Sequence, residues 1–198
     1  MLGHTHVVIA TATWGAFWWR PLTLGSTAIA APEATFGAGV PPVLSSLLAV
    51  SLGALLPDID HPRALLAQWK PAGRGGPLGL WRLIQPLVLP SLLVRETLGH
   101  RGALHSILAG VAVCTAVEYL AIITVAPGFG RALAWGYAAH LLADMLTRRG
   151  VPIAWPFTRR RVGFPRPITV RTGGFGEAIY LAATGAVAAL YASGALSS

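Results

Sequence analysis

The stretch Pro57-Asp58-Ile59-Asp60-His61-Pro62 brings three potential metal ligands into four consecutive positions. It follows the apolar run 40–56, in a chain that has only seven acidic residues and six histidines. Ionisable side chains at the edge of a hydrocarbon layer are costly, so they usually have a partner or a function. We therefore predict that Asp58 and His61 bind metal, and that Asp60 lies beside them or binds too. A turn that ends one helix and caps the next is the alternative interpretation.

His140 and Asp144 are four residues apart, so they share one face of a helix and can point to one ion. They lie in the apolar run 131–147, where a His-Asp hydrogen bond between helices is the alternative. His105 stands five residues after His100, a spacing that places the two on different helical faces. Of this pair, we predict that His105 binds metal directly.

Three further positions complete the predicted site. His4 and His6 are two residues apart, which helical geometry separates, so we assign His6 to the site and keep a solvated pair as the alternative. Asp60 or Glu177 is predicted to act as the general base. The glycines before Glu177 would allow the backbone to approach a ligand closely, but a flexible start of the helix explains them equally well. Arg101 is predicted to hold a substrate phosphate by bidentate hydrogen bonds. A simple anchor on the inner side of a membrane is the alternative for Arg101.

Composition indicates a membrane protein. Apolar residues make up 54% of the 198-residue chain and charged residues only 11%, whereas a soluble domain carries about a quarter charged residues. The net charge of +8 does not indicate a nucleic-acid partner, because the arginines cluster in short loops between apolar runs. Cys114 is the only cysteine, which excludes an intramolecular disulfide and leaves histidine and carboxylate as the ligands for a metal.

Five apolar runs approach the length of about 20 residues that a membrane-spanning helix needs. They are residues 6–24, 40–56, 105–126, 131–147 and 177–196, and the first of them is interrupted by Arg20-Pro21. A further run, 77–95, contains three prolines, so we predict a broken re-entrant or interfacial segment there. The predicted fold is thus an all-α integral membrane bundle of about five transmembrane helices, forming one domain over 1–198.

The charge distribution predicts an orientation. With a cytoplasmic N-terminus and no crossing by 77–95, only Arg20 and Arg131 of the fifteen basic residues lie near the outside. In this topology every histidine and four of the seven acidic residues gather at the cytoplasmic face. A crossing by 77–95 would destroy this convergence. Arg159 to Arg161 are predicted to anchor lipid headgroups, and Glu118, deep in 105–126, has no assigned role.

Three motifs occur in order along the chain: Leu56-Pro57-Asp58-Ile59-Asp60-His61-Pro62, then His100-Arg101-Gly102 with His105-Ser106, then Gly136-Tyr137 through His140, Asp144, Leu146-Thr147 and Gly150-Val151 to Trp155-Pro156. This ordered set resembles the YdjM-like family of bacterial and archaeal membrane-bound proteins, which are described as metal-dependent hydrolases. The resemblance implies a helical membrane protein with a metal site made from Asp58, His61, His105, His140 and Asp144. The sequence departs at Leu104, where members of the family often have threonine.

The sequence-based hypothesis is a metal-dependent hydrolase of the prokaryotic cytoplasmic membrane that cleaves a phosphoester or lipid-linked ester. Zinc is the first choice of metal, with manganese or iron as alternatives and one or two ions bound. The metal would lower the pKa of bound water towards ~7. The partner is membrane lipid, and no Gly-Lys-Ser/Thr loop, Gly-x-Ser-x-Gly elbow or His-Glu-x-x-His motif indicates other chemistry. The alternatives are a non-catalytic metal-binding protein, an ion transporter, and an interaction protein that docks a partner on the basic segment 148–171.

Overall fold

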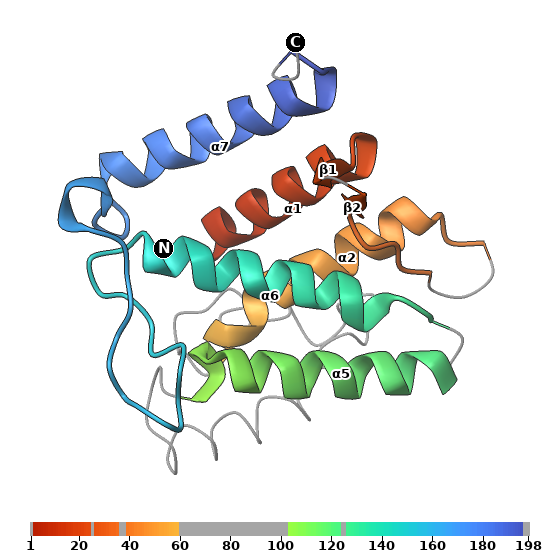
Figure 1. Cartoon of the computed structure of the whole chain (residues 1–198), viewed down its shortest axis with the longest axis horizontal. Helices are drawn as coiled ribbons and strands as arrows, with labels where there is room; N and C mark the ends of the chain where they lie inside the picture. The colour runs from red at the N-terminus through yellow and green to blue at the C-terminus, as the bar shows by residue number, and fades with distance from the viewer. Residues whose placement is uncertain (1, 25, 36–38, 60–102, 124–125, 196–198) are drawn as a thin grey trace, which may run out of the picture.

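The apolar runs of the sequence form α-helices. A computed structural model describes residues 2–24, 26–35, 39–59, 103–123 and 126–195 (Figure 1). Within these residues there are five α-helices and three 3-10 turns. They are α1 (Gly3–Trp19), α2 (Pro42–Leu55), η1 (Leu56–Asp58), η2 (Ala103–His105), α5 (Ile107–Ile123), α6 (Phe129–Met145), η3 (Arg166–Ile168) and α7 (Phe175–Ser193). The predicted helical class is confirmed, and the predicted segment 77–95 lies outside the described residues.

The first helix ends within the apolar run 6–24, before Arg20 and Pro21. Proline disfavours helical dihedrals in the residue before it, and Arg20, which precedes Pro21, is extended at φ −143° and ψ 94°. The chain then forms an antiparallel hairpin of β1 (Leu22–Leu24) and β2 (Thr27–Ile29). The interruption of the run at Arg20-Pro21 was predicted, whereas the hairpin was not.

The five helices alternate in direction (Figure 1). The starts of α1, α5 and α7 lie with the ends of α2 and α6 at one end of the bundle, which we call the cluster end. Asp58 and His105, which flank the stretch 60–102, are 3.3 Å apart there. The helix starts and ends that lie together at the cluster end are thus those that the predicted topology places on one side.

Among the described residues, α7 is the one helix that is long and apolar enough to cross a membrane by itself. The segments Pro42–Asp58 and Ile107–Ala121 are apolar but shorter. Five membrane crossings therefore stay a prediction.

Glycines allow α2 and α6 to approach more closely than other residues would permit. A Cβ atom added to Gly53 of α2 would lie 2.0 Å from the carbonyl oxygen of Leu133, and one added to Gly136 of α6 would lie 2.0 Å from that of Val50. The two backbones therefore touch directly, as is common between small residues of membrane helices. This contact places the last turns of α2 and α6 side by side.

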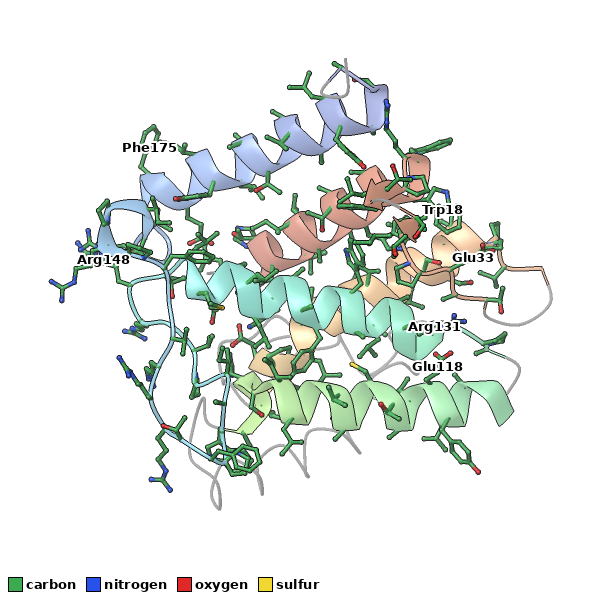
Figure 2. The ribbon with its side chains drawn as sticks, viewed as in Figure 1. Trp18, Glu33, Glu118, Arg131, Arg148 and Phe175 are labelled. Atoms are coloured by element: carbon green, nitrogen blue, oxygen red, sulfur yellow. The ribbon has the colours of Figure 1, made fainter. Side chains whose placement is uncertain are left out.

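Glu118 of α5 caps the start of α6 at the opposite end of the bundle. Its carboxylate accepts hydrogen bonds from the backbone N–H groups of Gly128 (3.1 Å), Gly130 (2.8 Å) and Arg131 (3.2 Å). It also pairs with the Arg131 side chain at 3.2 Å, as Figure 2 shows. The first N–H groups of a helix lack intrahelical partners and attract negative charge. Glu118 therefore has a structural explanation that the sequence did not reveal.

Replacing Gly136 by alanine is expected to destabilise the bundle by about 1–3 kcal/mol, because the new methyl group must push α2 away. Gly185→Ala on α7 is the matched control, since an added Cβ there meets nothing within 4 Å. Cys114 is buried and is the only thiol, so a thiol-reactive dye reports thermal unfolding in detergent. Equal melting temperatures for the two variants would contradict this packing account.

Candidate metal centre

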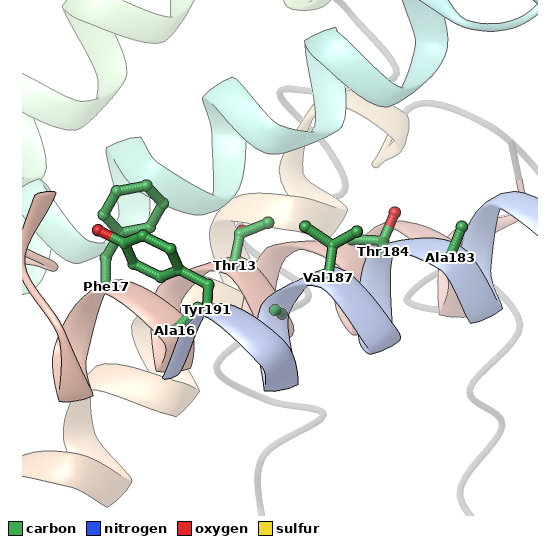
Figure 3. Close-up of a pocket in the computed structure, with 8 residues that line it drawn as sticks. Thr13, Ala16, Phe17, Ala183, Thr184, Val187 and Tyr191 are labelled. Carbon is green, nitrogen blue, oxygen red and sulfur yellow. The ribbon is translucent and has the colours of Figure 1, made fainter. Parts of the chain in front are cut away.

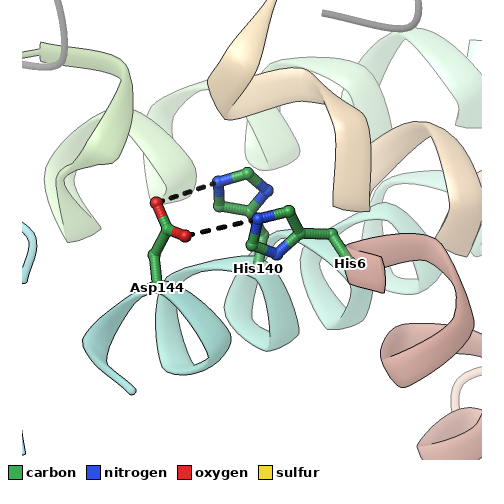
Figure 4. A group of neighbouring side chains, drawn as sticks. All are labelled: His6, His140 and Asp144. Carbon is green, nitrogen blue, oxygen red and sulfur yellow. Dashed lines mark ion pairs between the residues drawn. The ribbon is translucent and has the colours of Figure 1, made fainter. Parts of the chain in front are cut away.

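Five ionisable side chains from four segments converge at the cluster end, and we call them the His/Asp cluster. They are His6 of α1, Asp58 of η1, His105 of η2, and His140 and Asp144 of α6. Figure 4 shows the α1 and α6 members, with His6 and His140 both facing the Asp144 carboxylate.

Distances within the cluster fit shared metal ions. The Nε2 atom of His6 is 3.3 Å from Asp144 Oδ1, and those of His105 and His140 are 3.8 and 3.9 Å from Asp144 Oδ2. His105 Nε2 is also 3.3 Å from Asp58 Oδ1. Two atoms bound to one zinc ion at ~2.1 Å lie at most ~4.2 Å apart. All four distances fall below this limit.

His140 belongs to two groups of potential ligands. One group is His6, His140 and Asp144, and the other is Asp58, His105 and His140. The His140 ring stacks on that of His6, with centroids 3.8 Å apart, and meets that of His105 edge-on at 5.3 Å. The donor set is therefore large enough for one or two ions.

The cluster is buried and short of hydrogen bonds. His6, His105 and His140 are at most 1% exposed, and buried polar atoms are normally hydrogen-bonded. The Nε2 atoms of His6 and His105 lie 3.3 Å from carboxylate oxygens, yet several ligand atoms of the cluster make no hydrogen bond of good geometry within the described part of the chain. These atoms are His6 Nδ1 and Nε2, Asp58 Oδ1, His105 Nδ1 and Nε2, and His140 Nε2. A cation bound among them would satisfy imidazole and carboxylate donors, so the residues fit a metal.

The orientation of His140 is fixed from α2. Its Nδ1 lies 2.7 Å from the carbonyl oxygen of Ala54, in the last turn of α2, where carbonyl groups lack intrahelical partners. A carbonyl only accepts, so Nδ1–H donates and the lone pair remains on Nε2. Bonds of this kind orient metal-binding histidines. The close contact of α2 and α6 thus prepares His140 to bind a metal.

His105 is held through Tyr137, one turn before His140 on α6. The Tyr137 hydroxyl donates to the carbonyl oxygens of Leu104 and Ser106, on either side of His105. The Ser106 hydroxyl oxygen in turn accepts from the backbone N–H of Ala109 at 3.1 Å and caps α5. The position of η2 is therefore set by α6.

Glu177 lies outside the cluster. Its carboxylate accepts from the backbone N–H groups of Leu2 and Gly173, both at 2.7 Å, and from the Thr5 side chain. These bonds tie α7 to the start of α1, next to His6. Both oxygens are engaged, which favours a positioning role for Glu177 over the predicted role of general base.

The structure separates the predicted histidine pair at the N-terminus. His6 is fully buried in the cluster, whereas His4 is exposed. The predicted ligand His61 and the predicted catalytic residues Asp60 and Arg101 lie outside the described residues, so their roles stay predictions. His100 lies outside them too.

The carbonyl of Ala54 and the hydroxyl of Tyr137 were not identified as site residues from the sequence. An alanine carries no side-chain signal for a role played by its backbone. Tyr137 precedes His140 by three residues, so it lies on the same side of α6. This spacing was the available signal.

Fold and site together define a helical protein with a buried His/Asp cluster at one end of its bundle. The chain belongs to the family of YdjM inner membrane proteins, whose sequence profile matches residues 1–197. This membership supports a location in the bacterial inner membrane. Two curated relatives are both named inner membrane protein YdjM, one from Escherichia coli (strain K12) and one from Shigella flexneri. Each is 36% identical over 108 residues, which is 53% of this chain and 46% of the relative.

The chain thus spans about half the length of the curated relatives it matches. No solved structure matches it significantly.

Chemical modification will test the burial of His6. In the folded protein, diethyl pyrocarbonate is expected to carbethoxylate His4 and to leave His6 unmodified, because only the His4 ring is exposed. Peptide mapping by mass spectrometry resolves the two sites, and both should react after unfolding in denaturant. Equal rates of modification at His4 and His6 in the native protein would rule out the arrangement described.

Proposed function

We propose that the His/Asp cluster binds one or two divalent metal ions and that the protein is a membrane-embedded hydrolase of phosphoesters or lipid-linked esters. One observation carries this proposal. Ligand atoms from four separate segments meet in a buried place where, among the described residues, several lack hydrogen-bond partners. Imidazole and carboxylate donors suit zinc, manganese or iron, and zinc is the first choice.

A divalent metal at this position supplies Lewis acidity, which polarises an ester and lowers the pKa of water. Residues around the cluster hold its histidines in position. His140 is held by Ala54 and His105 by the bonds of Tyr137. Asp58 is the most accessible member, with its side chain 14% exposed, so we infer that water reaches the cluster from η1.

Two predicted residues flank this approach in the sequence. Asp60 follows Asp58 by two positions and remains the proposed general base, since Glu177 is engaged elsewhere. Arg101 precedes His105 by four positions and remains the proposed phosphate ligand. The positive-inside distribution of arginines favours the cytoplasmic side for the cluster end.

A non-catalytic metal site is the second candidate. The near-complete burial of His6, His105 and His140 favours it, because a structural metal site has all its positions filled by protein. Ion transport has less support. A transport path needs polar groups along a whole crossing, and at the far end Glu118 is tied to the start of α6.

The metal content of the detergent-purified protein, carrying no histidine tag, tests the proposal first. Mass spectrometry of the elements should find one or two equivalents of metal in the wild type. His140→Ala and Asp58→Ala should lose it, because each removes a ligand. His4→Ala and Glu33→Ala remove an exposed histidine and an exposed carboxylate and should retain it. A wild-type protein without stoichiometric metal would refute the proposal.

Turnover separates the two candidates. The wild type should hydrolyse at least one member of a phosphoester and lipid panel, lose that activity with a chelator and regain it with zinc. His140→Ala should be inactive. A metal-loaded protein without turnover on any ester, whose melting temperature falls on chelation, would favour the structural role.

A further inference from the structure

An apolar groove lies beside the His/Asp cluster. Helix α7 packs against α1, and a groove of about 360 Å³ opens between α6 and α7 with α1 as its floor. Trp135 and Leu146 mark the two ends of its α6 wall, and Tyr180 and Thr184 line it from α7. A second hollow of about 370 Å³, shown in Figure 3, adjoins it and shares Thr184. Together they follow α7 from Tyr180 to Tyr191.

The length of this groove matches one leaflet of a bilayer. Leu146 follows Trp135 by eleven positions on α6, and Tyr191 follows Tyr180 by eleven positions on α7. At ~1.5 Å per residue, each distance is ~16 Å along the helix axis. Half of a hydrocarbon core of ~30 Å is ~15 Å. The groove thus has the length that the acyl chain of one leaflet fills.

Positive charge surrounds the end of the groove that lies next to the cluster. The residues between Asp144 and Glu177 include seven arginines and no acidic residue. This arginine segment reaches the groove through Val170, which packs against Ile9 and Ala143, two residues that line the groove. The Val170 N–H donates to the Leu146 carbonyl at 2.9 Å, and the Val170 carbonyl oxygen accepts from Arg148 N–H at 3.2 Å.

Arg148 and Arg171, on the two sides of this contact, are both exposed, and Figure 2 shows the Arg148 side chain directed away from the bundle. Exposed arginines beside an apolar surface suit a headgroup phosphate.

We propose that the groove binds one acyl chain of an anionic glycerophospholipid, with the headgroup phosphate held by Arg148 and Arg171. Charge complementarity and length both favour this occupant.

The lipid would lie beside the candidate metal centre, because α1 and α6 border both. Ala139 and Ala143 line the groove, and each immediately precedes a cluster residue, His140 or Asp144. Resting on the proposed function, we infer that this lipid is the substrate class. Its ester groups would then lie at the cluster end, near Leu146.

Lipid retention tests the groove independently of activity. The protein is purified in detergent and offered phosphatidylglycerol or phosphatidylcholine with the same chains, and bound lipids are counted by native mass spectrometry. The wild type should retain one phosphatidylglycerol in preference to phosphatidylcholine. Ala138→Trp, which fills the groove, should weaken retention at least about tenfold, and Thr184→Leu serves as a second filling variant.

Ala189→Trp is the matched control, because Ala189 is exposed on α7 and lines neither hollow. Arg148→Gln with Arg171→Gln should remove the preference for phosphatidylglycerol while the acyl chain still binds. Thermal unfolding followed through Cys114 verifies that each variant is folded.

The outcomes separate the groove from the hydrolase. Folded filling variants that retain lipid like the wild type would overturn the groove, as would a wild type that holds metal but no lipid, or one whose groove is covered by a second copy in a stable dimer. His140→Ala should retain lipid normally, because the groove does not need the cluster. Retained lipid in a wild type without metal or turnover would support the groove and refute the hydrolase.

Discussion

The candidate metal centre depends on one contact, the hydrogen bond between His140 Nδ1 and the Ala54 carbonyl. It forms because glycines at 53 and 136 let α2 and α6 touch backbone to backbone. With Nδ1 occupied by donation to a carbonyl, the lone pair of His140 lies on Nε2, the atom nearest the Asp144 carboxylate. A contact between two apolar helices thus determines which nitrogen atom can bind a metal.

Hydrogen bonds from residues outside the cluster also hold His105 and the helix start that carries His6. Tyr137 fixes the turn that carries His105, and Glu177 ties the start of α1, next to His6, to α7. These bonds restrain the side chains of the cluster, and such preorganisation is what a functional site requires. At the opposite end Glu118 fastens α6 to α5, so both ends of α6 are held.

The sequence allowed the helical class and the convergence of the cluster to be predicted, because apolar runs and arginine distribution determine the order of helix ends. The spacing of four residues also predicted that His140 and Asp144 share one face of a helix. It did not identify the Ala54 carbonyl, since a backbone acceptor has no side-chain signature. Glu177 was predicted as a base from its position alone, whereas its backbone donors depend on how Leu2 and Gly173 meet in space. The hairpin after Trp19 was missed because apolar residues continue through it.

X-ray absorption at the zinc edge of the purified protein tests the central claim most directly. The account predicts stoichiometric zinc with only nitrogen and oxygen neighbours at about 2.0–2.2 Å and with the outer-shell scattering of several imidazole rings. That scattering should weaken in His140→Ala and stay unchanged in His4→Ala. A sulfur neighbour at about 2.3 Å, or a spectrum of zinc without imidazole, would contradict the assignment of the cluster as a metal centre.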